Sequence, residues 1–207
     1  MEFWEELFSK HGTLWNFYPS DSAVEIAEFF YSEGLKNILI PGVGYGRNAK
    51  PFIDKGLNLT GVEISESAIE LAKEHGYNFP IFYGSILDMP FDNTKYDGVF
   101  CYSLLHLFNE TTRSKMLSVC YNQLNENGYM VFVVVSINDK ILSKEKIISA
   151  NRYEMENGLK VYFYDPDSIE KQFIKFGLVS YKEIDEPIKF MPNEPDLRCY
   201  VITCRKT

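Results

Sequence analysis

The fold of this chain is decided by two neighbouring stretches, NILIPGVGYGRN at residues 37–48 and LTGVEIS at residues 59–65. The first is an apolar run that leads into a turn with glycines at 42, 44 and 46, and the second ends in the carboxylate of Glu63. Glycine allows a close backbone approach to a ligand, and an acid at the end of the next strand accepts hydrogen bonds from ribose hydroxyls. We therefore predict a strand–turn–helix–strand unit that binds an adenosyl group.

The spacing of the glycines separates two classes of cofactor. A dinucleotide fingerprint needs a third glycine three residues after the second, and Arg47 occupies that position. The pattern is instead G-x-G-x-G, and Glu63 follows Gly46 by 17 positions. Together these features resemble motif I and the acidic strand end of the class I S-adenosylmethionine-dependent methyltransferases. The resemblance implies that S-adenosylmethionine is the cofactor and S-adenosylhomocysteine the product.

Later motifs extend this resemblance over residues 37–135. GSILDMPF at 84–91 is similar to the motif after the third strand, LLHL at 104–107 to the segment after the fourth, and LNENGYMV at 124–131 to the turn before the fifth. The resemblance places the adenine beside Ser85 and Ile86, and the methionine beside Cys101 and Tyr102. The full set of cofactor-binding residues that it implies in this region is Gly42, Gly44, Tyr45, Gly46, Asn48, Glu63, Ile64, Ser85, Ile86, Cys101 and Tyr102.

Two positions depart from the family pattern. Most members have an acid two residues before the first glycine, where this chain has Ile40, and another after the third-strand glycine, where it has Ser85. The first change removes a partner for the cofactor ammonium, and the second replaces a carboxylate acceptor with a weaker hydroxyl. Two alternatives stay open for this reason. One is a methyltransferase-like protein that binds a ligand or partner without turnover, and the other is an NAD(P)-dependent dehydrogenase.

Composition narrows the class of protein further. A chain of 207 residues with 45% apolar content can bury a full core without disulfides or metal. Its net charge of −8 argues against a broad nucleic-acid surface. The cysteines and histidines lack metal-site spacing, and no apolar run is long enough to cross a bilayer. We expect one cytoplasmic domain over residues 1–207 with no metal, nucleic acid or membrane contact, and the oligomeric state stays open.

Apolar runs alternate with amphipathic segments along the chain, which predicts a Rossmann-like, doubly wound α/β sheet with helices on both faces. The family resemblance implies seven strands, mainly parallel, with an antiparallel last strand. We expect a helical cover at 1–35, a cofactor-binding core at 37–135, an acceptor-side insertion at 136–164, and a helix with closing strands at 165–207. Ser22 is predicted to cap the helix that follows Pro19.

Aromatic residues are frequent in the first twenty positions. We expect Trp15 and Tyr18 to close over the cofactor with their ring faces near the sulfonium, and a helix packed on the sheet edge is the alternative. FWEE at 3–6, with Trp15 and Pro19, resembles the N-terminal stretch of thiopurine and tellurite-resistance methyltransferases. That resemblance implies a small acceptor, such as a thiol or another soft nucleophile.

Methyl transfer demands little of the protein's side chains. A sulfonium is a good leaving group, so the site mainly aligns the nucleophile and excludes water. His106, just after the fourth strand, is the candidate general base, and a packed histidine at a helix start is the alternative.

The insertion at 136–164 contains both lysines and aromatic residues. We expect Lys140, Lys144 and Lys146 to lie on a solvated helix face. The residues predicted to contact the acceptor are Arg152, Tyr153 and Tyr164. The sequence therefore predicts methyl transfer to a small molecule.

Overall fold

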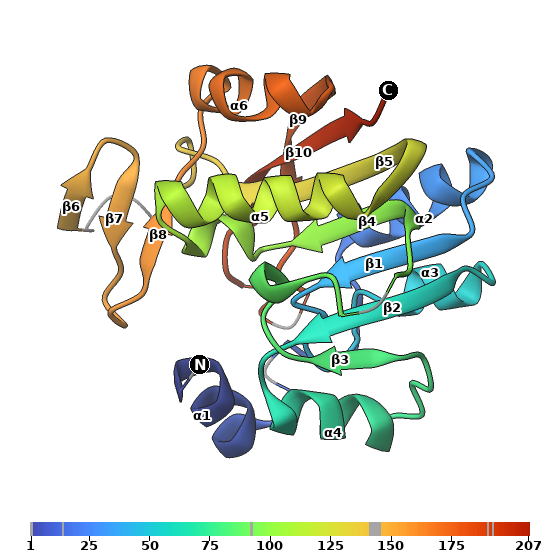
Figure 1. Cartoon of the computed structure of the whole chain (residues 1–207). Helices are drawn as coiled ribbons and strands as arrows, with labels where there is room; N and C mark the ends of the chain where they lie inside the picture. Colours follow the sequence, from blue (N-terminus) through green and yellow to red (C-terminus); the bar gives the residue numbers. More distant parts are fainter. Residues whose placement is uncertain (1, 14, 92, 141–145, 190, 192) are drawn as a thin grey trace.

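The computed structural model of the chain describes all residues except 1, 14, 92, 141–145, 190 and 192. A seven-stranded sheet with the order β3-β2-β1-β4-β5-β10-β9 forms its centre (Figure 1). These strands are β1 (Asn37–Pro41), β2 (Asn58–Glu63), β3 (Ile81–Tyr83), β4 (Tyr96–Tyr102), β5 (Leu124–Val135), β9 (Leu178–Glu186) and β10 (Leu197–Arg205). The helices are α1 (Glu2–His11), α2 (Asp21–Ser32), α3 (Lys50–Asp54), α4 (Glu66–Glu74), α5 (Glu110–Gln123) and α6 (Pro166–Phe173).

Strand direction follows the predicted pattern. β1 pairs in parallel with both β2 and β4, and β4 pairs in parallel with β5. β10 is antiparallel to both of its neighbours, β5 and β9, so β10 alone is reversed within this sheet. This confirms the Rossmann-like class and the antiparallel last strand. The chain leaves β1 toward one edge and returns at β4 toward the other, which creates a topological switch point where ligands bind in such sheets.

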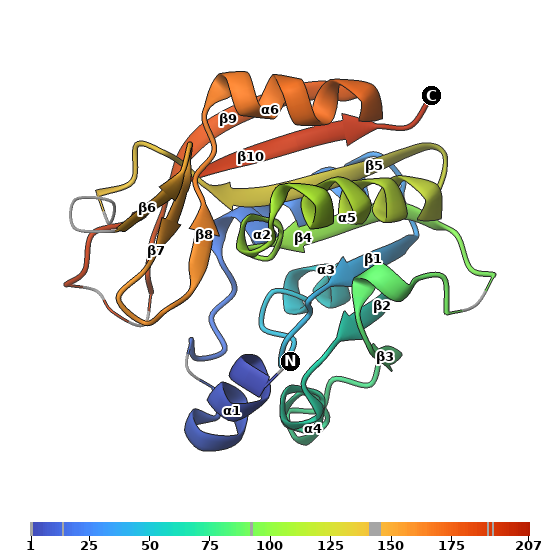
Figure 2. The same cartoon turned by 60° about the vertical axis from the view of Figure 1, so that its left-hand side comes forward.

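Two apolar layers cover the faces of this sheet. Successive strand residues point to opposite faces, so Leu39 packs in the layer beneath α5 and α6, whereas Ile38 and Ile40 pack in the layer beneath α2 and α3. Figures 1 and 2 show the same division, with α5 and α6 on one side of the sheet. Because both faces are covered, the carboxyl ends of the strands remain as the place for a site.

The insertion differs from its prediction. The described part forms a three-stranded antiparallel sheet of β6 (Lys146–Ser149), β7 (Arg152–Glu154) and β8 (Lys160–Tyr162), not a helix. Lys140 and Lys146 are exposed as expected, and Lys144 lies outside the described residues. In Figure 2 this small sheet stands beyond the ends of β4 and β5. It is therefore placed to wall one end of a site at the strand tips.

Local polar contacts fix the helix starts. The side chain of Ser20 accepts a hydrogen bond from the Ala23 amide and caps α2, so the predicted cap at Ser22 was wrong by two residues. Ser22 is instead buried inside the first turn. Among the described helices, none is both long and apolar enough to span a membrane.

Candidate functional site

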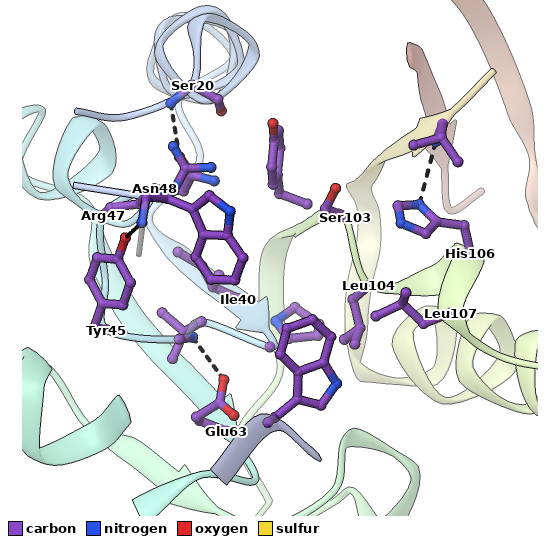
Figure 3. A pocket seen from close by; sticks show the side chains of 18 of the residues that line it. Ser20, Ile40, Tyr45, Arg47, Asn48, Glu63, Ser103, Leu104, His106 and Leu107 are labelled. Atoms are coloured by element: carbon purple, nitrogen blue, oxygen red, sulfur yellow. Dashed lines mark hydrogen bonds between the residues drawn. The ribbon is translucent and has the colours of Figure 1, made fainter. Parts of the chain in front are cut away.

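A cavity of about 690 Å³ opens at the carboxyl ends of the central strands (Figure 3). Five parts of the chain line it: the N-terminal segment, the loop after β1, the ends of β2 to β5, the turn and strand around β8, and the loop between β9 and β10. Pockets that bind small ligands have volumes of roughly 300–1,000 Å³. This cavity thus lies at the switch point of the sheet.

The loop after β1 needs its glycines for backbone reasons. Gly42, Gly44 and Gly46 have φ values of 62°, 56° and 88°, a region that costs other residues roughly 1–2 kcal/mol. The amides of Gly42 and Val43 both point at the carbonyl oxygen of Val62, at 2.8 and 3.3 Å. Gly42 and Gly44 line the cavity, whereas Gly46 is buried. The loop therefore presents bare backbone to any ligand.

Glu63 lies beside this loop at the end of β2. Its Oε2 accepts from the Gly44 amide at 2.8 Å, and its Oε1 accepts from the amides of Ile64 at 2.8 Å and Ser65 at 3.0 Å. The residue is 6% exposed. Burial raises the pKa of its carboxyl, and the three amides oppose that rise. Both Glu63 and Ile64 line the cavity.

Aromatic rings from the N-terminal segment cover the loop. Trp4, Phe8 and Trp15 line the cavity, and Trp15 stacks on Tyr45 of the loop with 6.5 Å between ring centroids. The Tyr45 hydroxyl accepts from the Trp15 amide at 3.1 Å and donates to the Asn16 carbonyl at 2.7 Å. The structure thus places Trp15 at the site.

Glu5 fastens the first helix to this region. Its carboxylate accepts from the hydroxyls of Ser65 at 2.6 Å and Ser67 at 2.5 Å, at the start of α4. These bonds lower the pKa of the Glu5 carboxyl. Because Ser65 directly follows the β2 end that carries Glu63, α1 is held close to the predicted ribose position.

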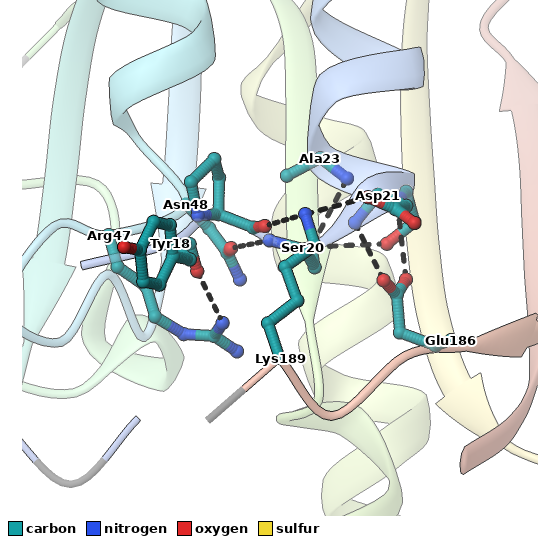
Figure 4. Close-up of polar contacts among 10 residues, drawn as sticks. Tyr18, Ser20, Asp21, Ala23, Arg47, Asn48, Glu186 and Lys189 are labelled. Atoms are coloured by element: carbon teal, nitrogen blue, oxygen red, sulfur yellow. Dashed lines mark hydrogen bonds and ion pairs between the residues drawn. The ribbon is translucent and has the colours of Figure 1, made fainter. Parts of the chain in front are cut away.

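The loop after β1 also forms hydrogen bonds with the N-terminal segment from one side (Figure 4). Arg47 donates to the Tyr18 carbonyl at 3.0 Å, and the Asn48 side chain accepts from the Ser20 amide at 2.9 Å. Tyr18 contributes its backbone only. Tyr18 is 64% exposed and does not line the cavity, so its ring lies away from the predicted cofactor site.

The end of β9 and the loop after it bind the same segment from the other side. Lys189 donates to the Pro19 carbonyl at 2.7 Å and pairs with the Asp21 carboxylate at 2.7 Å. Buried Glu186 accepts from the Asp21 amide at 2.6 Å. Figure 4 shows these contacts along one strip of chain, and Pro19 and Ser20 of this strip line the cavity.

The two departures from the family pattern both lie on the cavity wall. Ile40 is buried there, and Ser85 and Ile86 line the cavity beyond β3. The Ser85 hydroxyl accepts from the Leu87 amide at 3.2 Å, which caps a short 3₁₀ helix. Within the described part of the chain, Glu63 is the single carboxylate that lines the cavity. A cofactor ammonium would therefore rely on backbone carbonyls near Ile40.

The end of β4 corrects one prediction. Tyr102 lines the cavity, with the Arg47 guanidinium 5.5 Å from its ring centroid. Cys101 is only 1% exposed and packs in the opposite layer of the core, because neighbouring strand residues face opposite sides. Cys101 therefore does not line the cavity, contrary to the prediction. The chain then turns at Ser103, whose φ of 55° is uncommon for a residue with a side chain.

His106 lines the cavity from the 3₁₀ helix η2 (Leu105–Leu107). Its Nδ1 accepts from the Val135 amide at 3.4 Å, as the dashed line in Figure 3 shows. Burial lowers the pKa of His106 to about 4. The imidazole is thus neutral at pH 7, with its acceptor nitrogen already occupied by a backbone amide.

This lowered pKa makes the free energy of unfolding depend on pH. Free histidine titrates near ~6.5, so between that pH and about 4 the unfolded chain binds a proton that the folded chain does not. Stability is therefore lost as the pH falls through this window, by up to about 3 kcal/mol. We expect urea unfolding to show a larger loss between these pH values for the wild type than for His106→Gln. Equal losses in the two proteins would contradict the assignment.

The three residues predicted to contact the acceptor lie outside the cavity. Arg152 donates to the Phe108 carbonyl, and the Tyr153 ring packs edge-on against Phe163 at 5.4 Å. Tyr164 is fully buried, and its hydroxyl donates to Gln172 at 2.7 Å. None of Arg152, Tyr153 and Tyr164 lines the cavity.

Other residues occupy that end of the cavity instead. They come from the turn and strand of the small sheet and from the loop between β9 and β10: Met155, Asn157, Leu159, Val161, Phe163, Pro187, Ile188, Lys189 and Met191. Sequence reasoning missed all of them. The Asn157-Gly158 pair is a hairpin signal that would have predicted the turn before β8.

Comparison with known proteins agrees with this geometry. Residues 38–128 match the family model described as a methyltransferase domain. The match covers β1 to the turn within β5, and so includes the glycine loop, Glu63 and Tyr102. No relative was found among curated proteins.

Solved structures share the whole fold at low sequence identity. The 1,6-didemethyltoxoflavin-N1-methyltransferase of Burkholderia thailandensis has a TM-score of 0.72 at 16% identity, over 98% of this chain and 84% of that one. Magnesium protoporphyrin IX methyltransferase from Synechocystis PCC 6803 has a TM-score of 0.69 at 12% identity, over 98% of this chain and 95% of that one. TehB from Haemophilus influenzae has a TM-score of 0.68 at 15% identity, over 99% of this chain and 67% of that one. The chain has the class I S-adenosylmethionine-dependent methyltransferase fold, and its residues 38–128 match the methyltransferase domain.

Proposed function

We propose that this chain transfers a methyl group from S-adenosylmethionine to a small-molecule acceptor. The observation that carries the proposal is the contact of Glu63 with a loop of three glycines at positive φ, at the switch point of the sheet. Fold neighbours hold the same ligands: the Burkholderia thailandensis enzyme binds S-adenosylhomocysteine with its small substrate, and the Synechocystis enzyme binds S-adenosylmethionine.

The cofactor is proposed to lie across the tips of β3, β2, β1 and β4. In this arrangement Glu63 binds the ribose, Ser85 and Ile86 hold the adenine, and Tyr102 borders the methionine. Backbone of the glycine loop and the rings above it complete the site: Gly42, Gly44, Tyr45, Asn48, Ile64 and Trp15, all of which line the cavity. Gly46 shapes the loop from within.

The reaction needs alignment more than side-chain chemistry. Bound S-adenosylmethionine would supply the methyl group on a good leaving group, and the residues around the cavity would hold the nucleophile in line with that methyl. The aromatic rings over the loop, and the hydrogen bonds that hold residues 18–21 from both sides, exclude water from the site. The four cysteines are unpaired and buried, which suits a reducing compartment, and we propose a cytoplasmic location.

Intrinsic fluorescence tests the cofactor proposal. Trp4 and Trp15 are the chain's two tryptophans, and both line the cavity. We therefore expect S-adenosylhomocysteine to change the emission saturably, and NAD to leave it unchanged. Trp15→Phe should retain binding with a smaller signal. An unchanged spectrum with S-adenosylhomocysteine, or an equal response to NAD, would contradict the proposal.

A further inference from the structure

The cavity has two ends that lie over different strands. Glu63 and Ser85 lie at the ends of β2 and β3, whereas Val135 and Leu197 lie at β5 and β10. β2 and β5 are three strand spacings apart in the sheet, roughly 14 Å. We call the far end the acceptor chamber, defined by Leu107, Phe108, Leu159, Val161, Phe163 and Ile188.

The acceptor chamber contains no charge that is free to pair with a ligand. None of its six defining residues is charged, and the two cations that line the rest of the cavity both have partners. Lys189 contacts the Asp21 carboxylate and the Pro19 carbonyl, and Arg47 donates to the Tyr18 carbonyl and lies over the Tyr102 ring. No carboxylate lines this end within the described part of the chain. Burying an ion without a partner is costly, so a charged acceptor would bind poorly here.

His106 supplies a directional contact to this apolar space. Because the Val135 amide donates to Nδ1, the neutral ring carries its proton on Nε2. Nε2 has no hydrogen-bond partner within the described residues, and it is not fully buried. Its N–H therefore faces the cavity that the ring lines. In this tautomer His106 donates a hydrogen bond and cannot accept the nucleophile's proton.

Resting on the proposed function, we infer that the methyl acceptor is a neutral, largely apolar molecule with a hydrogen-bond-accepting atom, which His106 orients as a donor. In this proposal His106 is a hydrogen-bond donor and not the general base that the sequence predicted. The nucleophile takes the methyl, and the positive charge of the sulfonium passes to it. If the nucleophile carried a proton, that proton leaves to water after the transfer.

Binding of three probes with one ring system to the S-adenosylhomocysteine complex tests this inference. Quinoline is neutral and accepts a hydrogen bond, quinoline-2-carboxylate is an anion, and N-methylquinolinium is a cation. We expect quinoline to bind at least about tenfold more tightly than either ion, because the ions lose hydration without a partner. Equal or tighter binding of an ion, or no binding of any probe, would overturn the inference. Loss of S-adenosylhomocysteine binding itself would instead contradict the proposed function.

Charge placed in the acceptor chamber should change this preference. Leu159→Glu is expected to favour N-methylquinolinium by about tenfold over quinoline, because the new carboxylate pairs with the cation. Ile147→Glu makes the same change on β6, where the residue is 71% exposed, and should leave the preference as in the wild type. Identical behaviour of the two variants would show that the probes bind elsewhere.

Variants of His106 separate orientation from a purely structural role. His106→Gln keeps a donor and should hold quinoline within a few-fold of the wild type, whereas His106→Leu should weaken it by about tenfold. S-adenosylhomocysteine affinity, unchanged in both, shows that the fold is intact. Wild-type quinoline affinity should also stay level from about pH 6 to 8.5, since His106 does not titrate there. Wild-type affinity in His106→Leu would overturn its role.

Discussion

Replacing Glu63 with glutamine is expected to weaken S-adenosylhomocysteine binding by about 10- to 100-fold. Hydrogen bonds to a charged group are worth about 1.5–3 kcal/mol, and the ribose hydroxyls would lose that charge. No other carboxylate lines the cavity within the described residues, so nothing there replaces Glu63. Isothermal titration calorimetry measures the change directly.

Glu66→Gln is the matched control for this prediction. Glu66 lies three positions further along, is exposed, and does not line the cavity. Its replacement should leave the affinity within about twofold, since exposed charges interact weakly. Equal effects of Glu63→Gln and Glu66→Gln would remove Glu63 from its assigned role. Because Glu63 also accepts from three backbone amides, Glu63→Gln should lower apo stability as well.

Gly177→Ala should destabilise the fold by about 2–5 kcal/mol. Gly177 ends the helical segment before β9 at a φ of 71°, and its carbonyl accepts from the Arg205 amide at 2.8 Å. A Cβ there would stand 2.1 Å from the Arg205 carbonyl oxygen, a backbone atom that cannot move without displacing β10. The cost of a left-handed backbone and the cost of the clash therefore add.

Gly158→Ala separates these two costs. Gly158 has a similar φ of 81°, but nothing lies within 4 Å of its Cβ position. Only the conformational cost of about 1–2 kcal/mol should appear in this variant. Urea unfolding of both proteins measures the difference. A loss at Gly177 no larger than that at Gly158 would contradict the close packing of Gly177 against β10.

The sequence predicted those parts of the site that lie in one continuous unit. Residues 37–65 contain β1, the glycine loop and β2, so the distance between Gly44 and Glu63 is set by local chain geometry. The central strands could also be predicted, because buried strands such as β5 contain a continuous apolar run, whereas the number of seven strands came from the family resemblance. Side chains alternate between the two faces along β4, so Cys101 and Tyr102 point to opposite sides of the sheet. The prediction that both residues contact the cofactor overlooked this alternation.

The remaining walls depend on contacts between distant parts of the chain. Glu186 meets Asp21 across 165 positions, and Lys189 meets Pro19 across 170, so no local pattern predicts either contact. The small sheet in the insertion was missed because its strands are short and are stabilised by pairing with one another. The acceptor chamber takes Leu159, Val161, Phe163 and Ile188 from these segments, so this part of it could not be predicted from the sequence.

A crystal of the protein soaked with S-adenosylhomocysteine tests the central claim most directly. A carboxylate has about four lone-pair sites, and Glu63 uses three of them for backbone amides in the free protein. Two ribose hydroxyls therefore require Glu63 to release one amide, and we expect this to be that of Gly44. The predicted result is ribose within hydrogen-bonding distance of Glu63, with the sulfur pointing toward Tyr102. A ligand bound elsewhere, or a cavity that stays empty at saturating concentration, would contradict the account.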